Sequence, residues 1–245
     1  MRLIPMLSTP SGSTLTAKNW QSLGVSVVSY DLAALLIKPG FNVLKLFADL
    51  NSYVGWPEDI ILQATFPAPD RSGNYILRSP YDGSRAAFTA EEILEIIAWL
   101  NPAAVLLPQG IAFDQAIERL PASIFTYYTP EDSPLRPVGQ GIYVKSTEWS
   151  EEKSRQWAGI KCCVYGPTSQ LQYQTFAQQG VAVVISDTPA EDACQGRLYT
   201  SHGMDRLPAW MHNHEYLDLL IQSTALLYQR YAVMINYNWL RELLH

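Results

Sequence analysis

The chain has 245 residues, of which 48% are hydrophobic and 16% are charged, and its formal net charge at pH 7 is −6. This length is long for an average domain but ordinary for a single α/β barrel, and the hydrophobic content suffices for one large core. The chain is acidic overall and has no cluster of Lys or Arg, so it has no general attraction to phosphate backbones. The charge therefore disfavours RNA binding.

The composition also predicts where the protein works. No apolar run reaches the roughly 18 residues of a membrane span, and Pro5 and Ser8 interrupt the apolar start, so we expect neither a membrane helix nor a secretory leader. The cysteines Cys162, Cys163 and Cys194 form no C-x-x-C pair, which is typical of reduced thiols. We therefore expect a cytoplasmic protein.

Short apolar segments predict eight strands, at 3–7, 26–30, 60–64, 104–107, 123–128, 141–144, 161–165 and 181–186. Several are followed by helical patterns: Thr89 and Glu92 form a capping box before one helix, and 168–179 predicts another. The alternation implies a parallel sheet, and eight strands predict a shortened (β/α)8 barrel of the TIM type in a single domain, 1–245. No convincing helix separates 123–128 from 141–144.

The end of the chain, 206–245, is predicted to be a helical segment. Apolar side chains recur there at helical spacing, at Tyr216, Leu219, Leu220, Leu226, Leu227, Tyr231 and Met234. The same stripe would form by packing on the barrel or on a partner chain, and the spacing does not separate these two alternatives.

The segment 180–200, GVAVVISDTPAEDACQGRLYT, combines a buried-type strand with a turn and a glycine-punctuated loop. It resembles the stretch G-V-D-x-F-D-C-x-x-P-T-R-x-A-R-x-G-x-L-F-T of tRNA-guanine transglycosylases. The positions that agree without a gap are Gly180, Val181, Pro189, Ala193, Gly196, Leu198 and Thr200. Further blocks match in chain order at 24–40, 50–64, 78–92 and 166–180, so the resemblance covers most of the chain.

The resemblance also identifies what is missing. The nucleophilic Asp of the family falls on Ile185, the acid of its D-S-G-G block on Gln63, and its base-recognising Asp on Gln109. An aliphatic side chain cannot attack a ribose carbon, so the family's base exchange is not expected here. The cysteines of the family's zinc site are absent as well, and we predict no metal and no cofactor. His202, His212 and His214 could form another metal cluster, although a solvated loop is the simpler interpretation.

Barrel chemistry takes place at the carboxyl ends of strands, where the sequence places Asp31, Gln63, Gln109 and Asp187. The two glutamines can hydrogen-bond a purine or pyrimidine edge, or can simply cap the barrel mouth. Asp187 follows Ile185 by two positions, so on an extended strand it would point to the same face about 6.6 Å further along and could replace the lost nucleophile. The alternative for Asp187 is ordinary turn chemistry before Thr-Pro.

Arg78 and Asp82 flank a tight turn in the block RSPYDGS and are candidate binding residues. The carboxylate of Asp82 can accept backbone N–H bonds, and Arg78 can pair with it, so a purely structural role is the alternative.

The sequence supports two main hypotheses. The first is a transglycosylase-like barrel without base exchange, which binds a 7-deazaguanine or purine base and acts as a binding or partner subunit in tRNA queuosine modification, with a homo- or hetero-oligomer formed through the C-terminal helices. The resemblance also makes tRNA a candidate partner, against the acidic charge of the chain. The second is an active transferase or hydrolase that uses Asp187. A barrel that has drifted to an unrelated ligand is a third alternative.

Overall fold

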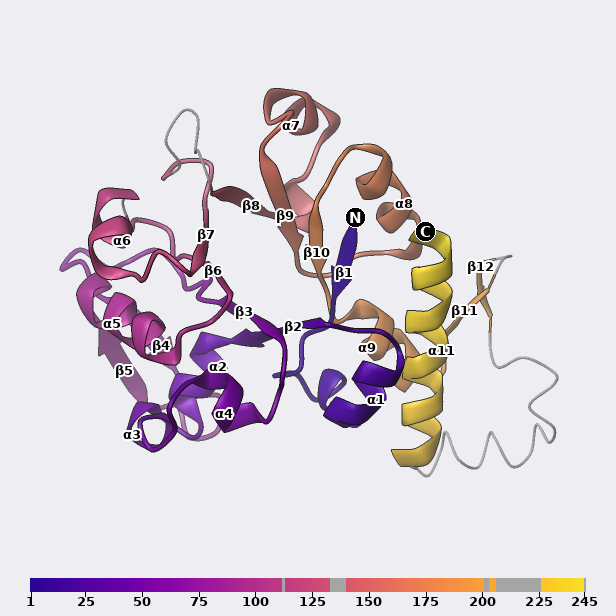
Figure 1. Ribbon diagram of the computed structural model, residues 1–245, viewed down its shortest axis with the longest axis horizontal. Coiled ribbons are helices and arrows are strands. Elements are labelled where there is room, and N and C mark those ends of the chain that lie inside the picture. The colour runs from indigo at the N-terminus through magenta and orange to yellow at the C-terminus, as the bar shows by residue number, and fades with distance from the viewer. Residues whose placement is uncertain (112, 133–139, 201–202, 206–225, 245) are drawn as a thin grey trace.

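The computed structural model describes residues 1–111, 113–132, 140–200, 203–205 and 226–244. Eight parallel strands form one nearly closed barrel sheet, and all eight predicted strands are confirmed within a few residues (Figure 1). Their order around the sheet is β1 (Arg2–Ile4), β10 (Val183–Ile185), β9 (Lys161–Tyr165), β8 (Gly141–Lys145), β7 (Phe125–Tyr128), β6 (Ala104–Leu106), β3 (Asp59–Gln63) and β2 (Val27–Asp31).

The sheet closes where the chain after β1 meets β2. Met6 and Ser29 form a parallel bridge: the Ser29 N–H donates to the Pro5 carbonyl and the Leu7 N–H to the Ser29 carbonyl, both at 2.9 Å. Toward the amino ends of the strands from this bridge, no hydrogen-bonded ladder joins β1 to β2. The barrel is therefore closed at its carboxyl end and open along one seam at its amino end.

Helices lie outside the strands, as expected for a (β/α)8 barrel (Figure 1). They are η1 (Gly12–Thr14), α1 (Ala17–Ser22), α2 (Leu32–Ile37), α3 (Phe41–Leu44), α4 (Leu50–Val54), α5 (Ala90–Leu100), α6 (Phe113–Arg119), η2 (Ser146–Glu148), α7 (Glu151–Gln156), α8 (Gln170–Gln178), α9 (Thr188–Cys194) and α11 (Leu226–Leu244). The predicted capping box opens α5, with the Glu92 carboxylate accepting from the Thr89 N–H at 2.8 Å. Between β7 and β8 the described residues, 129–132 and 140, contain no helix.

Two antiparallel hairpins were not predicted. The first pairs β4 (Tyr75–Arg78) with β5 (Arg85–Phe88), and the second pairs β11 (Leu198–Thr200) with β12 (Gly203–Asp205). Strands of three or four residues carry too short an alternation for a sequence pattern to reveal them.

Helix α11 packs on the barrel, which confirms intramolecular packing for this part of the predicted helical segment. Its Arg230 donates to the Thr14 carbonyl at 3.1 Å, and the Tyr237 hydroxyl donates to the Ser186 carbonyl at 3.2 Å. The Tyr237 ring meets the Trp20 ring edge-on, with centroids 4.7 Å apart. The predicted helical stripe before residue 226 lies outside the described residues.

Side chains fill the inside of the barrel, as is usual for this architecture. The interior cluster contains Ile4, Val27, Ile61, Ala104, Leu106, Tyr127, Tyr143, Cys163, Val183 and Ile185. The three cysteines are free, and no helix in the described part of the chain is long and apolar enough to cross a membrane.

Candidate functional site

The carboxyl ends of several strands surround one cavity of about 260 Å³ at the barrel mouth. Three of the predicted site residues line it: Asp31 at the end of β2, Gln63 at the end of β3, and Asp187 two residues after the end of β10. The remaining walls are formed by Met6, Thr9, Thr65, Tyr165, Gly166, Pro167, Thr188 and Glu191. The fourth residue that the sequence places at a strand end, Gln109, does not line this cavity.

The extended conformation from which the direction of Asp187 was predicted is not present. The strand β10 ends at Ile185, and Asp187 has helical backbone angles, φ −97° and ψ −7°, as the N-cap residue of α9. The chain therefore bends before Asp187 instead of continuing as an extended strand. Pro189 in the first turn of α9 favours this early helix start, because its fixed φ suits that position.

The carboxyl group of Asp187 has no hydrogen-bond partner among the described residues, although both of its oxygens are buried and the residue is only 7% exposed. It makes no capping bond to α9, so the turn chemistry considered for it is not formed. The nearby Thr9 hydroxyl donates instead to the Met6 carbonyl, at 3.0 Å. A buried polar group without a partner is costly, and its presence beside a cavity is characteristic of functional sites.

Burial raises the pKa of Asp187 from 3.8 to about 7, and the charge of Glu191 acts in the same direction, while the Thr9 side chain opposes the shift. Near neutral pH the group is thus a mixture of carboxylic acid and carboxylate. In the acid form it offers one donor and one acceptor, and in the ionised form it offers acceptors only.

The other two residues of the cavity are held in place by local hydrogen bonds. The Gln63 side chain is 2% exposed and donates through Nε2 to the Ser29 hydroxyl at 3.2 Å, which in turn donates to the Pro5 carbonyl. The Asp31 carboxylate caps α2 by accepting from the Ala33 N–H at 2.8 Å. Burial raises the pKa of Asp31, and the backbone N–H groups at the start of α2 oppose this rise.

Gln109 lies outside this cavity, in an adjoining one of about 540 Å³. Thr65 and Tyr165 line both cavities. The Gln109 carbonyl accepts a hydrogen bond from the Tyr75 hydroxyl at 2.7 Å, and its side chain is exposed. The second cavity also contains Lys145, Lys153, Glu131 and Glu148.

Arg78 and Asp82 are not part of the barrel mouth, because they lie on the β4–β5 hairpin. Both are exposed, and no ion pair joins them. Asp82 accepts from the Ser84 N–H and hydroxyl at 3.0 and 2.8 Å, and hydrogen bonds from Ser79 and Ser84 lower its pKa to about 2. The geometry matches the predicted turn bonds and gives no pairing with Arg78.

Ile185, the position aligned with the family's nucleophile, is fully buried in the interior cluster. It has no polar atom in its side chain and faces Ile4, Tyr165 and other core residues rather than the mouth cavity. The residue is thus part of the packing of the barrel.

Sequence reasoning missed Thr9, Thr65 and Tyr165 as cavity residues. They lie on the connections after β1 and β3 and at the end of β9, and nothing in their local sequence separates them from ordinary loop residues. Within the described residues, no three His, Cys, Asp or Glu side chains are grouped to hold a metal ion. His202, His212 and His214 lie outside the described residues.

Comparison with curated proteins gives a distant relationship. Queuine tRNA-ribosyltransferases of Thermotoga petrophila and Thermotoga maritima are each 27% identical to the chain over 101 residues, which are 38% of this chain and 27% of the relatives. A queuine tRNA-ribosyltransferase of a further Thermotoga strain is 26% identical over the same length. The match therefore spans about a quarter of the relatives' length, and no protein-family model matches.

Proposed function

We propose that the protein is a transglycosylase-like barrel that binds a guanine-type or 7-deazaguanine base at its mouth without exchanging it. In this proposal it serves as a binding or partner subunit in queuosine-type tRNA modification. The observation that carries the proposal is the Asp187 carboxyl group, which is buried without a partner beside a cavity that Gln63 also lines.

The chemistry of the cavity suits the edge of a purine-like base. A carboxylic acid pairs with a ring N–H and its neighbouring carbonyl, whereas a carboxylate accepts from two adjacent N–H groups. Around the pKa of Asp187 both forms are present. The volume of about 260 Å³ lies just below the roughly 300–1,000 Å³ of drug-sized ligand pockets, which suits a single base better than a nucleotide.

The absence of exchange rests on Ile185. A covalent nucleotide intermediate needs a nucleophile that reaches the ribose carbon, and the side chain at this position is apolar and enclosed in the core. The distant similarity to queuine tRNA-ribosyltransferases supports the ligand class. Binding is favoured over turnover by Gln63, Gln109 and Ile185, the positions on which the resemblance places the family's acids.

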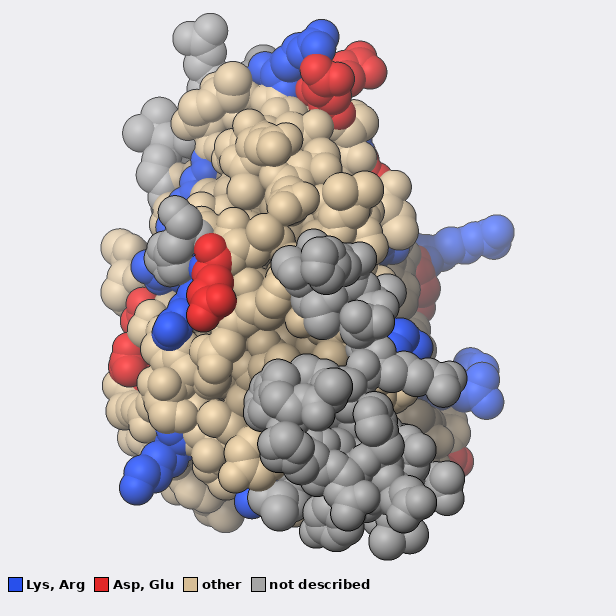
Figure 2. Space-filling view, turned by 90° about the vertical axis from the view of Figure 1, so that its right-hand side faces the viewer, with Lys and Arg blue, Asp and Glu red and all other residues tan. Residues whose placement is uncertain are grey.

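The partner role is supported by the outer surface of α11. On the side of the molecule that carries this helix, most charged side chains of the described residues lie toward the edges of the view, and much of the described surface between them is uncharged (Figure 2). Tyr231 is 54% exposed on α11, and Leu171 is 72% exposed on the neighbouring α8. Depletion of charge together with exposed aromatic and aliphatic side chains is typical of the core of a protein interface.

Binding and exchange can be tested separately. Binding is measured by calorimetric titration with guanine, 7-deazaguanine and queuine, and adenine serves as control. Thermal unfolding gives an independent measure: a ligand at a hundredfold excess over its Kd should raise the free energy of unfolding by about 2.7 kcal/mol. Labelled guanine should not enter tRNA. Failure of every guanine-type base to bind would contradict the proposal.

The state of Asp187 favours a second candidate, an active transferase or hydrolase. A general acid or base works best with a pKa near the operating pH, which is where burial places this carboxyl. If the protein releases or transfers a base from a nucleoside or tRNA, Asp187→Asn should abolish turnover, while Glu152→Gln, at an exposed position of α7, should leave it unchanged. Unchanged turnover in Asp187→Asn would remove this candidate.

A further inference from the structure

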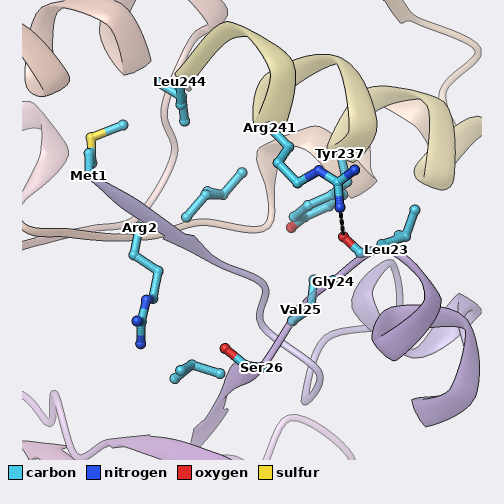
Figure 3. Close-up of a pocket in the computed structure, with 11 residues that line it drawn as sticks. Met1, Arg2, Leu23, Gly24, Val25, Ser26, Tyr237, Arg241 and Leu244 are labelled. Atoms are coloured by element: carbon cyan, nitrogen blue, oxygen red, sulfur yellow. Dashed lines mark hydrogen bonds between the residues drawn. The ribbon is translucent and has the colours of Figure 1, made fainter.

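A third pocket lies at the opposite end of the barrel, in the seam between β1 and β2 (Figure 3). It has a volume of about 270 Å³. Its walls come from β1, from the segment that leads into β2, and from α11, and are formed by Met1, Arg2, Leu3, Leu23, Gly24, Val25, Ser26, Val27, Tyr237, Arg241 and Leu244. We call it the seam pocket.

The seam is open because of Pro5. The parallel pattern that pairs Ser29 with Pro5 and Leu7 would next require the N–H of residue 5 to donate to the Val27 carbonyl. Proline has no N–H, so this bond cannot form. The ladder stops at the Met6–Ser29 bridge, and the two strands separate towards their amino ends.

The separation leaves main-chain groups facing the pocket. Arg2 bonds to the β10 side, through its N–H to the Ala182 carbonyl at 2.9 Å, so by strand alternation the Leu3 N–H and carbonyl point into the seam. On β2, the N–H and carbonyl of Ser29 bond to Pro5 and Leu7. Val27 lies two residues earlier, so by the same alternation its N–H and carbonyl also point into the seam. Neither pair is bonded across the seam in the described structure.

The charge of the pocket is opposite to that of the protein. Two arginines, Arg2 and Arg241, line it, no acidic residue does, and neither arginine forms an ion pair within the described residues. This occurs in a chain of net charge −6. Positive groups beside low-dielectric walls concentrate field lines and attract anions.

Arg241 is held in position before any ligand arrives. Its Nη1 donates to the Leu23 carbonyl at 2.7 Å, which leaves the other guanidinium nitrogens without a partner in the described part of the chain. The guanidinium packs over Gly24, where a Cβ atom would lie 2.8 Å from Nη1. Arg2 lies on the far side of the pocket and extends away from Arg241 (Figure 3).

We propose that the seam pocket binds a small carboxylate with an aliphatic body, whose head group is bound by Arg241 and whose body lies among Leu3, Val25 and Leu244. Arg2 adds to the positive potential. A planar guanidinium with free N–H groups binds a carboxylate through charge-assisted hydrogen bonds, and the apolar walls match an aliphatic chain. The pocket volume equals about nine water molecules at ~30 Å³ each, which suits a chain of about eight carbons.

The test is a calorimetric titration of the full chain with octanoate at low salt, with 1-octanol as the neutral analogue. We expect one saturable octanoate site and binding of 1-octanol about tenfold weaker or less, because the alcohol lacks the charge. Arg241→Gln should weaken octanoate about tenfold or more. The matched control is Arg155→Gln, which removes a surface arginine of α7 and should leave the affinity unchanged.

Two further variants keep the test decisive if Arg241→Gln does not fold. Val25→Phe fills the pocket and should abolish octanoate binding, and Arg2→Gln should weaken it a few fold by lowering the potential. Equal affinity for octanoate and 1-octanol, unchanged affinity in Val25→Phe, or no saturable binding would overturn the proposal. None of these results bears on base binding at the mouth.

Discussion

The two ends of the barrel differ in how the sheet is completed. At the carboxyl end the chain just after β1 is joined to β2 by a hydrogen-bonded bridge at Met6 and Ser29, and the connections beyond this bridge enclose a buried carboxyl group. At the amino end the same two strands are unpaired, and α11 covers the gap with an arginine and apolar side chains. One proline separates these two environments, which shows how a single missing donor creates a pocket in a barrel wall.

The largest expected loss of stability comes from removing the hydrogen bonds that attach α11 to the barrel. Asn236 is fully buried; its amide nitrogen donates to the Pro189 and Arg197 carbonyls, and its oxygen accepts from the Tyr199 N–H. Asn236→Leu leaves these backbone groups unsatisfied and should lower the free energy of unfolding by about 3–5 kcal/mol. Urea unfolding measures it, with Asn238→Ala on the same helix expected within about 0.5 kcal/mol of the wild type.

The mouth alone is addressed by the pH dependence of stability. The folded pKa of Asp187, about 7, exceeds its unfolded value of 3.8, so the folded state holds the proton more tightly. The free energy of unfolding should therefore fall as the pH rises from about 4 to about 7, by at most about 1.4 kcal/mol for each unit of pKa shift.

Asp187→Asn imitates the protonated carboxyl and should remove this fall. The variant should be more stable than the wild type by about 1–3 kcal/mol at pH 8 and equal to it near pH 4. Thermal unfolding across this pH range measures the difference, and Glu152→Gln, at an exposed position of α7, serves as control. Parallel pH profiles for the wild type and Asp187→Asn would show that the carboxyl is not buried as described.

The contact between Gly24 and Arg241 beside the seam can be tested by comparing two glycine-to-alanine substitutions. Gly24 has φ +73° and lies against Arg241, whereas Gly159 has φ +85° with open space around it. Both Gly→Ala variants incur the left-handed strain of about 1 kcal/mol, and only Gly24→Ala also displaces the guanidinium. We expect Gly24→Ala to cost about 1–2 kcal/mol and more than Gly159→Ala; equal costs in urea unfolding would deny the Arg241 contact.

The smallest expected effect is a difference in hydrogen exchange, in the unsubstituted protein, between the bonded and the unbonded part of the seam. The amides of Leu7 and Ser29 are hydrogen-bonded across it, while those of Leu3 and Val27 are not. Hydrogen exchange followed by NMR should therefore be slower at Leu7 and Ser29. Equal protection at all four amides would mean that the ladder continues past Pro5.

The barrel was predictable from the sequence because each strand is an apolar run with a helical pattern or turn beside it. The strand ends at Asp31 and Gln63 followed from the same pattern, and the cavity indeed unites them with Asp187. The conformation of Asp187 could not be predicted in this way. The prediction assumed that β10 continues through Asp187, whereas the strand ends at Ile185 and α9 begins at Thr188, with Pro189 in its first turn. Local pattern places residues on elements but does not give the conformation of the one or two residues between them.

The seam pocket was not predictable, because it depends on which strand faces Pro5. In the sequence Pro5 is only an interruption of an apolar start. Its effect depends on the fold, which brings the segment after β1 beside β2 and returns α11 from the other end of the chain. Contacts between residues more than two hundred positions apart, such as Arg241 with Leu23, carry no local signal.

The most direct test of a base-binding mouth is an NMR titration of the Asp187 carboxyl carbon, in the free protein and with 7-deazaguanine. The account predicts a midpoint near pH 7 in the free protein, because the carboxyl is buried without a partner, and a clear displacement of that midpoint when the base is bound. A midpoint near 4 that the base does not change would contradict it.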